Sequence, residues 1–466
     1  MKLVGPLLLA LATAPASAAQ GGVKEAPCPF DWEPKTHRAT CFSVTQADGG
    51  TTMGADFAPS NEAAGPPVVH LPGGPGETPV GEDGTIKAIL TLFPDRRVLT
   101  MNPRGVKGSG DHPRCNVAPL LEDELAADAA RTLGRRCRKA TAAIDFRRFD
   151  PRRLAADVDA FVRARDVERA VAHGVSFGTE TALRLAEAPP PWLEAVVLDS
   201  FSPPDALDLA GQMAASDRFL AAVDAWCYGG EDDCADGGDL NGWLAKFDGE
   251  PLVVEGMKSA ETPWQLDAAE MAGFLAGLAG YPDGVVVAVS QLTWLEDDPK
   301  AAVAWMAEYI DGNAAFVADS LPLTLSAYGG SLTDADRALP EKLRTEPPPY
   351  PTAIEDLEAY LALLEGWAEP KAAAWSPPAR FDVPVLVLSG GLDPLTPPEW
   401  AEELDRALAQ KGARYVFPEL GHAVSLGDDW AEDADIRRQL GCAAALAAAF
   451  PQMPDDDCEE YRADDG

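Results

Sequence analysis

The sequence predicts an α/β protein in which helices cover both faces of a mostly parallel sheet and a helical insertion interrupts the sheet. Three observations lead to this prediction. Short apolar strand patterns alternate with amphipathic helix patterns up to about residue 200, and the same alternation resumes near residue 383. The segment between them is Ala-rich and mainly helical in its spacing. Strands that alternate with helices typically pair in parallel and are buried on both faces.

The first part of the chain contains the strands in order. RATCFSVTQ and TTMGADFAP flank the turn sequence ADGG, which predicts a β-hairpin. GPPVVHLPGGPG and DRRVLTMNPRG each combine a buried strand with a following loop. Residues 151–165 place Leu154, Val158, Phe161 and Val162 on one side of a helix. A strand, a tight turn and a helix follow in VERAVAHGVSFGTETALRLAE, and LEAVVLDS is a further buried strand.

The pattern changes at FSPPD and returns after WSPPARFDVP, where VPVLVLSGGLDPLTPP, EWAEELDRALAQ and ARYVFPELGH predict a strand, a helix and a strand. We therefore divide the chain into five segments. They are a signal peptide (1–18), the first part of the α/β core (19–203), a helical cap (204–376), the second part of the core (377–450) and an acidic tail (451–466).

The N-terminal segment predicts export. Lys2 precedes a short apolar stretch, and Ala16-Ser17-Ala18 supplies the small residues of a signal-peptide cleavage site. We expect a periplasmic or secreted protein, with no second apolar stretch long enough to span a membrane. An even number of cysteines in an oxidising compartment predicts disulfides. Pairing between chain neighbours is the simplest arrangement, although spacing alone leaves the connectivity open. The eight cysteines are Cys28, Cys41, Cys115, Cys137, Cys227, Cys234, Cys442 and Cys458.

Charge and composition exclude several partners. The formal net charge of −37 repels nucleic acid and anionic lipid and favours solubility. No C-x-x-C pair is present and the five histidines are scattered singly, so we expect neither a metal nor a cofactor. An acidic surface could attract the positively charged end of a peptide or another small molecule, although net charge is weak evidence for such a substrate. The oligomeric state is not indicated by the sequence.

Ser176 lies in the turn G-V-S-F-G, where a buried strand ends and a helix begins. Glycines on both sides allow a tight strand-to-helix turn that holds a serine hydroxyl away from the backbone. An ordinary glycine-rich turn with a solvated serine is the alternative. A serine becomes a nucleophile when an imidazole accepts its proton and a carboxylate orients that imidazole.

Two later residues could complete such a site. His422 follows the last predicted strand, and Asp393 follows the strand before it, in the turn SGGLDPLTPP. Asp199, after the strand LEAVVLDS, is a rival for the acid; if Asp393 is the acid, we expect Asp199 to join the sheet to the cap. A lone histidine is often structural, but its position after the final strand favours catalysis. His37, His112 and His173 lie where no general base is expected, and His70 would support the neighbouring glycine-rich turn.

The turn HLPGGPG predicts part of an oxyanion hole. Acyl transfer needs two backbone N–H donors directed at the developing oxyanion. Phe177, directly after the serine, would supply one donor, and Gly74 would supply the other. Gly73 and Gly76 would give the loop room, and the prolines at 72 and 75 would stiffen it.

Six motifs in order resemble the proline iminopeptidase and tripeptidyl aminopeptidase branch of the α/β-hydrolases, closest to exported members with a TAP-like C-terminal part. They are PGGPG, NPRGVKGSG, GVSFGTETALRLA, VVLDSFSPP, SGGLDPLTPPEWA and GHA, and the resemblance covers about residues 38–203 and 380–445. It implies an α/β-hydrolase fold and cleavage at free N-termini without a metal. It also places Ser176, Asp393 and His422 on the triad positions, and Gly74 and Phe177 on the oxyanion positions.

The chain departs from the family pattern at two motifs. Pro72 stands where the family usually has a histidine, and Asn102 stands where it usually has an aspartate. The resemblance further implies acidic cap residues that bind the substrate's α-amino group. Asp267 and Glu270 in QLDAAEM are candidates for this role, and an exposed acidic face is the alternative reading of these two residues.

The sequence therefore leads to a hypothesis of an exported serine aminopeptidase of proline iminopeptidase or tripeptidyl type. Two other functions remain. A secreted carboxylesterase or broad small-acyl hydrolase would use the same triad without amine-binding acids. A non-catalytic binding protein that kept the fold would be expected to lack a triad member, and none is missing.

Overall fold

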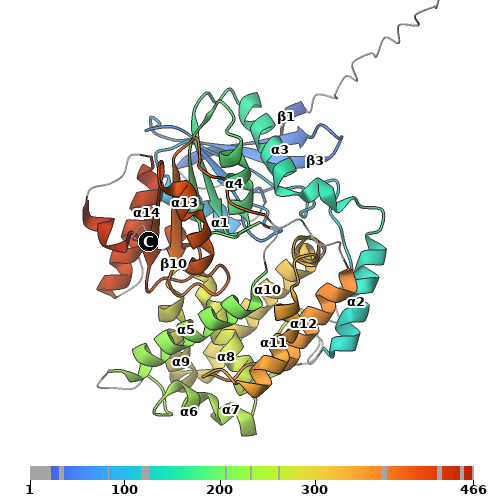
Figure 1. Ribbon diagram of the computed structural model, residues 1–466, viewed down its shortest axis with the longest axis vertical. Helices are drawn as coiled ribbons and strands as arrows, with labels where there is room; N and C mark the ends of the chain where they lie inside the picture. Colours follow the sequence, from blue (N-terminus) through green and yellow to red (C-terminus); the bar gives the residue numbers. More distant parts are fainter. Residues whose placement is uncertain are drawn as a thin grey trace, which may run out of the picture.

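The computed structural model describes residues 22–30, 36–81, 83–116, 125–204, 207–230, 234–260, 263–368, 375–427, 433–451 and 456–463. The predicted signal peptide and the last three residues of the acidic tail lie outside these ranges. Figure 1 shows a sheet with flanking helices in the upper half of the molecule and a layer of helices in the lower half.

The described residues form a nine-stranded sheet in the order β1-β2-β3-β5-β4-β6-β7-β10-β11. The hairpin of β2 and β3 is antiparallel, as predicted, whereas every pair from β5 to β11 is parallel. The mostly parallel sheet is therefore confirmed. The strands are β1 (Gly22–Ala26), β2 (His37–Thr45), β3 (Thr51–Pro59), β4 (Val68–Leu71), β5 (Val98–Met101), β6 (Ala170–Val175), β7 (Leu193–Asp199), β10 (Val385–Gly390) and β11 (Gly412–Phe417).

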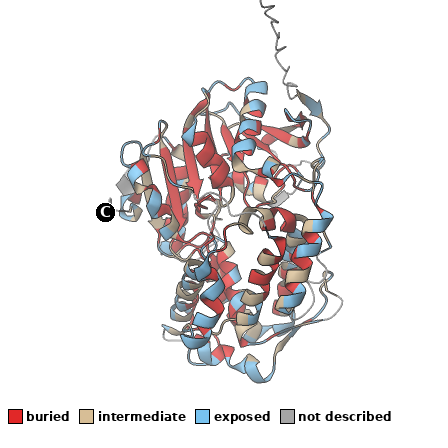
Figure 2. Ribbon diagram, turned by 45° about the vertical axis from the view of Figure 1, so that its right-hand side comes forward, coloured by how far each residue is buried: buried red, intermediate tan, exposed pale blue. Residues whose placement is uncertain are grey.

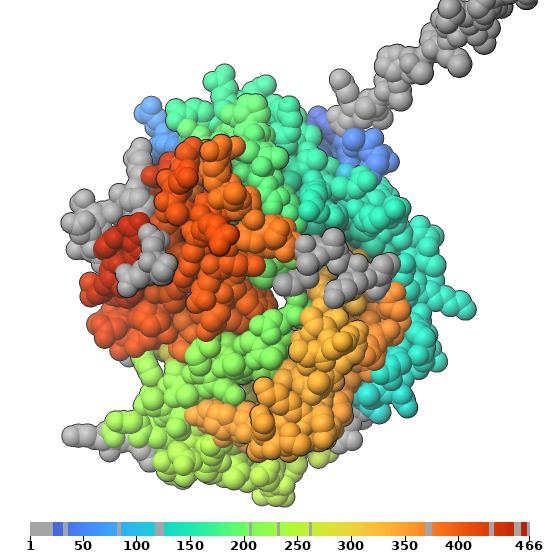
Figure 3. Space-filling model, viewed as in Figure 1, coloured from blue at the N-terminus to red at the C-terminus, as the bar shows by residue number. Residues whose placement is uncertain are grey.

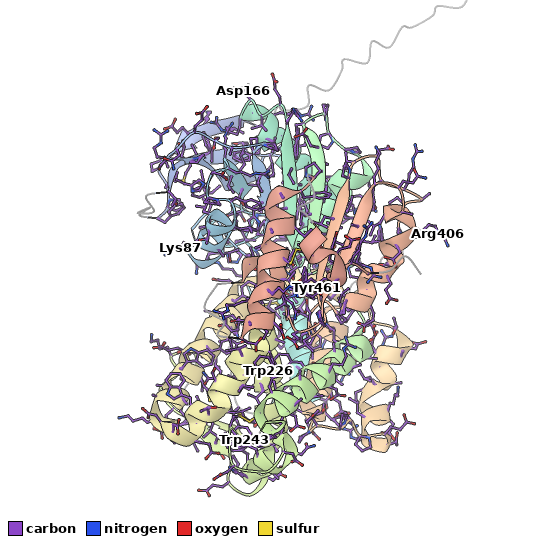
Figure 4. All side chains as sticks on the ribbon, turned by 90° about the vertical axis from the view of Figure 1, so that its left-hand side faces the viewer. Lys87, Asp166, Trp226, Trp243, Arg406 and Tyr461 are labelled. Carbon is purple, nitrogen blue, oxygen red and sulfur yellow. A yellow bond between two sulfur atoms is a disulfide. The ribbon has the colours of Figure 1, made fainter. Side chains whose placement is uncertain are left out.

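Helices cover both faces of this sheet. In Figure 4, Lys87 of α1 (Asp83–Leu92) and Arg406 of α13 (Asp405–Leu408) lie on opposite sides of it. On the α13 side, α3 (Pro151–Ala164) and α4 (Gly178–Glu187) join one apolar cluster with the strands, and α14 (Ala434–Ala449) packs on the opposite face. Figure 2 shows the central strands as almost wholly buried, which explains their continuous apolar sequences. The helix predicted for EWAEELDRALAQ is mainly a 3-10 helix, Pro398–Leu404, that continues into α13.

The segment between β7 and β10 forms the helical layer. Trp243, near the lower end of this layer in Figure 4, is 1% exposed and belongs to an apolar cluster that continues into the sheet through residues such as Val197 and Leu386. A small antiparallel pair of strands, β8 (Leu252–Val254) and β9 (Trp264–Leu266), lies within it. The helices are α5 (Leu209–Tyr228), α6 (Leu240–Leu244), α7 (Lys246–Gly249), α8 (Ala268–Gly277), α9 (Gly284–Asp297), α10 (Pro299–Tyr328), α11 (Asp334–Thr345) and α12 (Ile354–Trp367).

One helix from before the nucleophile turn also belongs to this layer. Helix α2 (Ala127–Ala140) lies along α12, and the two segments touch in the space-filling view of Figure 3. Gly134 and Gly366 make this approach possible, because a Cβ atom on either would collide with backbone of the other helix. The sequence assigned residues 127–140 to the core, whereas their packing places them with the cap helices.

Four disulfides join the eight cysteines: Cys28–Cys41, Cys115–Cys137, Cys227–Cys234 and Cys442–Cys458. This is the pairing between chain neighbours that was the simplest reading of the sequence. Each bridge ties a loop or terminal segment to a nearby helix or strand. Within the described ranges, no helix is both long enough and apolar enough to span a membrane.

Candidate active site

The turn at Ser176 connects β6 to α4 at the carboxyl end of the sheet. Ser176 has a φ of 54°, a left-handed conformation that is uncommon for residues other than glycine. Its neighbours must be small. A Cβ atom on Gly174 would lie 2.7 Å from the Gly178 carbonyl oxygen, and one on Gly178 would overlap the Leu71 carbonyl of β4. The structure thus contains the strained strand-to-helix turn that the G-x-S-x-G sequence predicts.

Asp393 and His422 meet across the ends of β10 and β11. The imidazole Nδ1 lies 2.7 Å from Asp393 Oδ2, and the two residues are 0% and 8% exposed. A histidine that donates its Nδ1 proton to a carboxylate presents Nε2 as the proton acceptor. The structure therefore brings together two of the three residues that the sequence places in the triad.

Thr396 is a third member of this group that the sequence analysis missed. Its hydroxyl donates to Asp393 Oδ2 at 2.7 Å and lies 3.2 Å from His422 Nδ1. Asp393 Oδ1 accepts the backbone N–H groups of Leu395 and Thr396 at 2.8 and 3.0 Å. An aspartate whose side chain accepts the amides two and three residues later forms a turn motif. The D-x-x-T spacing could therefore have indicated that Thr396 contacts Asp393.

The charges around His422 set the pKa of its imidazole. Burial lowers this pKa, but the attraction and hydrogen bond of Asp393, together with the charges of Asp199 and Glu77, outweigh burial. The net result is a pKa above the ordinary value of 6.5. The imidazolium form is accordingly favoured by its surroundings, as a general base that must hold a proton during the reaction requires.

Asp199, the rival acid, occupies a different place. It is 0% exposed, and its carboxylate accepts the backbone N–H groups of Val424 and Ser425 rather than a ring nitrogen. Its own backbone carbonyl accepts the N–H of Ser176 at 2.9 Å. Asp199 therefore lies between the serine turn and the histidine loop, and its side chain binds that loop rather than joining the sheet to the cap.

The glycine-rich turn after β4 lies beside Ser176. Gly74 has a φ of +109°, which suits glycine alone. The neighbouring N–H of Gly73 is already bound, since it donates to Glu77 Oε2 at 3.0 Å. A Cβ atom on Gly73 would be 3.2 Å from both Glu77 Oε1 and the Ser176 Cβ, so the Glu77 carboxylate lies close to the serine. The sequence analysis did not single out Glu77.

The helical layer is attached to both sides of this site. The backbone N–H groups of Gly421 and His422 donate to the carbonyls of Pro282 and Ala279, each at 2.8 Å. On the other side, Gly76 touches Ser320 of α10 so closely that a Cβ atom on Gly76 would lie 2.5 Å from the serine Cβ. The histidine loop and the glycine-rich turn are thus both in direct contact with the layer.

A cavity of about 630 Å³ extends from Phe177 and Gly76 between the sheet end and the helical layer. Helix α4 contributes Glu180 to the cavity wall. Glu180 follows Ser176 by four residues and is 5% exposed. Ser202 Oγ donates to Glu180 Oε1 at 3.4 Å. The wall combines apolar and charged side chains. Its apolar members include Val106, Ile144, Phe146, Phe149, Leu154, Leu323 and Ala327, and its charged members include Arg104, Arg138, Asp145, Arg147 and Asp150.

Asp267 and Glu270 form a capping box at the start of α8. Asp267 Oδ1 accepts the N–H groups of Ala269 and Glu270 at 2.8 and 3.0 Å, and Glu270 Oε2 accepts the N–H of Asp267 at 2.9 Å. Neither residue is among those that line the cavity. Their contacts account for the D-x-x-E spacing as a helix start, and their predicted role at the substrate amine has no support in these contacts.

The other four histidines make different contacts. His37 and His112 lie within hydrogen-bond distance of the carbonyls of Arg96 and Asp319, at 3.0 and 2.9 Å. His70 and His173 are buried side by side on β4 and β6, with ring centres 5.7 Å apart. Among the described residues, no group of three or more His, Cys, Asp or Glu side chains is arranged to hold a metal ion.

Two family descriptions match the chain. Residues 66–225 match the α/β-hydrolase fold, and residues 364–440 match the TAP-like proteins. No curated protein sequence matches.

Similar solved structures include the proline iminopeptidase of Mycobacterium smegmatis, at 14% identity over 91% of this chain and 100% of that chain, with a TM-score of 0.36. A proline iminopeptidase-related protein from Thermus thermophilus has 16% identity over 93% of this chain and 99% of that chain, with a TM-score of 0.36. A thermophilic esterase from Thermogutta terrifontis has 15% identity over 82% of this chain and 92% of that chain, with a TM-score of 0.34.

Proposed function

Because the chain belongs to the α/β-hydrolase fold family and has a TAP-like C-terminal part, we propose that it is a serine aminopeptidase that releases residues or short peptides from free N-termini. The observation that carries the proposal is the 2.7 Å contact between His422 Nδ1 and the buried carboxylate of Asp393, at the sheet end where Ser176 occupies its strained turn. The Asp393–His422 pair supplies a base with a defined tautomer, and Ser176 is the candidate nucleophile at the same end of the sheet.

The proposed reaction proceeds through an acyl-enzyme. Ser176 Oγ attacks the scissile carbonyl carbon while His422 Nε2 accepts the hydroxyl proton. The backbone N–H groups of Gly74 and Phe177 stabilise the negative oxygen of the tetrahedral intermediate. The intermediate collapses, and the leaving amine takes the proton from His422. Water, deprotonated by the same imidazole, then hydrolyses the ester and regenerates Ser176.

Two carboxylates support a substrate with a positively charged end. Glu180 lies in the wall of the cavity and is only 5% exposed. Glu77 lies near Ser176 and acts on the pKa of His422 through its charge. A carboxylate shielded from water attracts an ammonium group more strongly than an exposed one. We propose that Glu180 binds the free α-amino group, in place of Asp267 and Glu270.

The proposal includes export. The four disulfides support it, because disulfides persist in the periplasm and outside the cell and are rare in the reducing cytosol. The N-terminal sequence, with its A-x-A cleavage site, agrees with this location.

A carboxylesterase is the second candidate. The observation in its favour is the apolar part of the cavity wall, which includes Ile144, Phe146 and Phe149 and suits an acyl chain as well as a peptide side chain. The same triad would hydrolyse an ester, and Glu180 would then have no cationic partner in the substrate.

One substrate panel separates the two functions. Prolyl, alanyl and alanyl-alanyl-prolyl arylamides are compared with their N-acetylated forms and with short-chain aryl esters, using the wild type and Ser176→Ala. An aminopeptidase loses most of its amide turnover when the substrate amine is acetylated, and Ser176→Ala loses it altogether. Equal turnover of free and acetylated amides supports the esterase or broad hydrolase, and undiminished turnover by Ser176→Ala contradicts the serine mechanism.

A further inference from the structure

Asp199 and Ser200, where β7 ends, bind three consecutive backbone amides of the histidine loop. The N–H of Ala423 donates to Ser200 Oγ at 2.8 Å. The next two, of Val424 and Ser425, donate to Asp199 Oδ1 and Oδ2 at 3.0 and 2.9 Å. These amides directly follow His422 in the chain. The position of the imidazole relative to the sheet is therefore set in part by this pair.

The same residue also binds the serine turn. The backbone carbonyl of Asp199 accepts the N–H of Ser176 at 2.9 Å, so Asp199 contacts the nucleophile turn with its backbone and the base loop with its side chain. Ser176, Ser200 and Ala423 have φ values of 54°, 58° and 60°. Three non-glycine residues in the left-handed region meet at this point, and such strain persists only where surrounding bonds hold it.

The carboxylate of Asp199 has only neutral hydrogen-bond donors in the described part of the chain. They are the N–H groups of Val424 and Ser425 and the hydroxyls of Ser200 and Ser425. Burial raises the pKa of this carboxyl group above its ordinary value, and these donors together with the charge of His422 offset only part of that rise. This set of donors contains no cation, and the negative charge of Asp199 raises the pKa of the His422 imidazole.

We propose that Asp199 is a positioning residue of the active site, which holds His422 in register with Ser176 and supplies a second buried negative charge behind the imidazole. This inference rests on the proposed serine mechanism. The groups that act on the His422 charge are Asp393 from the loop after β10, Glu77 from the glycine-rich turn and Asp199 from β7. His173 contacts the same loop through Ser425 Oγ, at 3.1 Å, but burial keeps its pKa far below neutrality, so it adds no charge near pH 7.

Asp199→Asn tests both parts of the proposal. It keeps the shape of the side chain but removes the charge and places an amide donor against backbone N–H groups. We expect kcat to fall at least tenfold with KM little changed, because the geometry of proton transfer is disturbed while substrate contacts remain. We also expect the acidic limb of kcat/KM to move to lower pH, because a less negative environment lowers the pKa of His422.

Ser200→Ala separates geometry from charge. It removes the acceptor for the Ala423 N–H and one hydroxyl donor to Asp199, but it keeps the Asp199 carboxylate, so kcat should fall several-fold while the acidic limb moves much less than in Asp199→Asn. This variant also keeps the test decisive if Asp199→Asn does not fold. A Ser200→Ala enzyme with wild-type kcat would overturn the positioning role.

Asp336→Asn is the matched control. Asp336 is 3% exposed and also accepts backbone amides, of Thr333 and Leu209 at 2.8 and 3.3 Å, but it lies in the helical layer at the start of α11. It should lower the melting temperature without changing the pH profile. The proposal is wrong if Asp336→Asn lowers kcat and shifts the acidic limb of kcat/KM as Asp199→Asn does. It is also wrong if Asp199→Asn has the kcat and the acidic limb of the wild type.

A fluorophosphonate probe keeps this outcome apart from a failure of the proposed function. The wild type should react at Ser176, forming an oxygen–phosphorus bond with loss of fluoride. A wild type that is neither labelled nor active refutes the serine mechanism itself. An active, labelled wild type whose Asp199→Asn variant is indistinguishable from it refutes only the role of Asp199.

Discussion

The hydroxyl of Thr396 donates a 2.7 Å hydrogen bond to Asp393 Oδ2, the same oxygen that His422 Nδ1 contacts. Residues of the turn that contains Asp393 therefore fix the position of its carboxylate. Two backbone amides on Oδ1 and one hydroxyl on Oδ2 leave the carboxylate little freedom to rotate. The orientation of the imidazole depends on this turn as much as on the carboxylate itself.

Replacing Thr396 by Val should lower kcat about tenfold, since loss of one hydrogen bond to a charged group costs about 1.5–3 kcal/mol and a buried acceptor loses a partner. Thr396→Ser, which restores the hydroxyl, should recover most of the activity. Steady-state kinetics on an arylamide measure both variants. Equal kcat for the wild type and Thr396→Val would show that the hydroxyl does not orient Asp393.

Glu180→Gln should raise KM for substrates with a free α-amino group by about tenfold or more, because a charge-assisted hydrogen bond is worth about 1.5–3 kcal/mol. Turnover of aryl esters without an amine should change little. Glu187→Gln is the control, since Glu187 lies on the same helix but pairs with Arg184 and Trp375 and does not line the cavity. A uniform loss on amines and esters alike would assign Glu180 to the structure of α4 instead.

The acidic limb of kcat/KM should lie above pH 6.5. His422 accepts a proton only when neutral, and its pKa is raised above the ordinary value by nearby carboxylates that outweigh its burial. An aryl acetate is the suitable substrate because it carries no amine that titrates in this range. A limb below pH 6.5 would mean that burial dominates over the carboxylates at this imidazole.

Stability should decline as the pH falls below about 6.5, the unfolded pKa of histidine. Burial lowers the pKa of His173 to about 3 and lowers that of His70 as well, so the folded protein resists protonation that the unfolded chain accepts. Each such histidine removes about 1.4 kcal/mol per pH unit between its two pKa values. Urea unfolding at pH 7, 6 and 5 measures the slope.

The variant His70→Phe should lose less unfolding free energy per pH unit than the wild type, because one histidine fewer takes up a proton on unfolding. Its control is His112→Gln, which replaces a half-buried histidine outside the sheet. A wild-type slope in His70→Phe would indicate that His70 is not protonated on unfolding in this pH range.

Much of the sheet could be predicted because its signals are local. The apolar runs at 170–175, 193–199 and 385–390 are strands, and the glycines around Ser176 permit the tight turn. The disulfides also join chain neighbours, so proximity along the chain was a sufficient guide. The spacing of Asp267 and Glu270 was also sufficient to predict a capping box, although the resemblance favoured a role for them at the substrate amine.

The contacts between distant segments could not be predicted in this way. Asp199 meets Val424 and Ser425 across more than 220 residues, because β7 and the histidine loop become neighbours only in the strand order of the sheet. Helix α2 joins the cap only because Gly134 and Gly366 face each other. Likewise, Glu180 reaches the cavity wall only once α10 and the segment 144–151 close over it.

The amino-acid sequence by itself determined which residues could react and which elements carry them, since periodicity and turn chemistry act over a few residues. Only the tertiary structure decided which carboxylate bonds to the imidazole and which binds the backbone of its loop. Those contacts depend on strand order and on packing between segments far apart in the chain, and no local pattern encodes them.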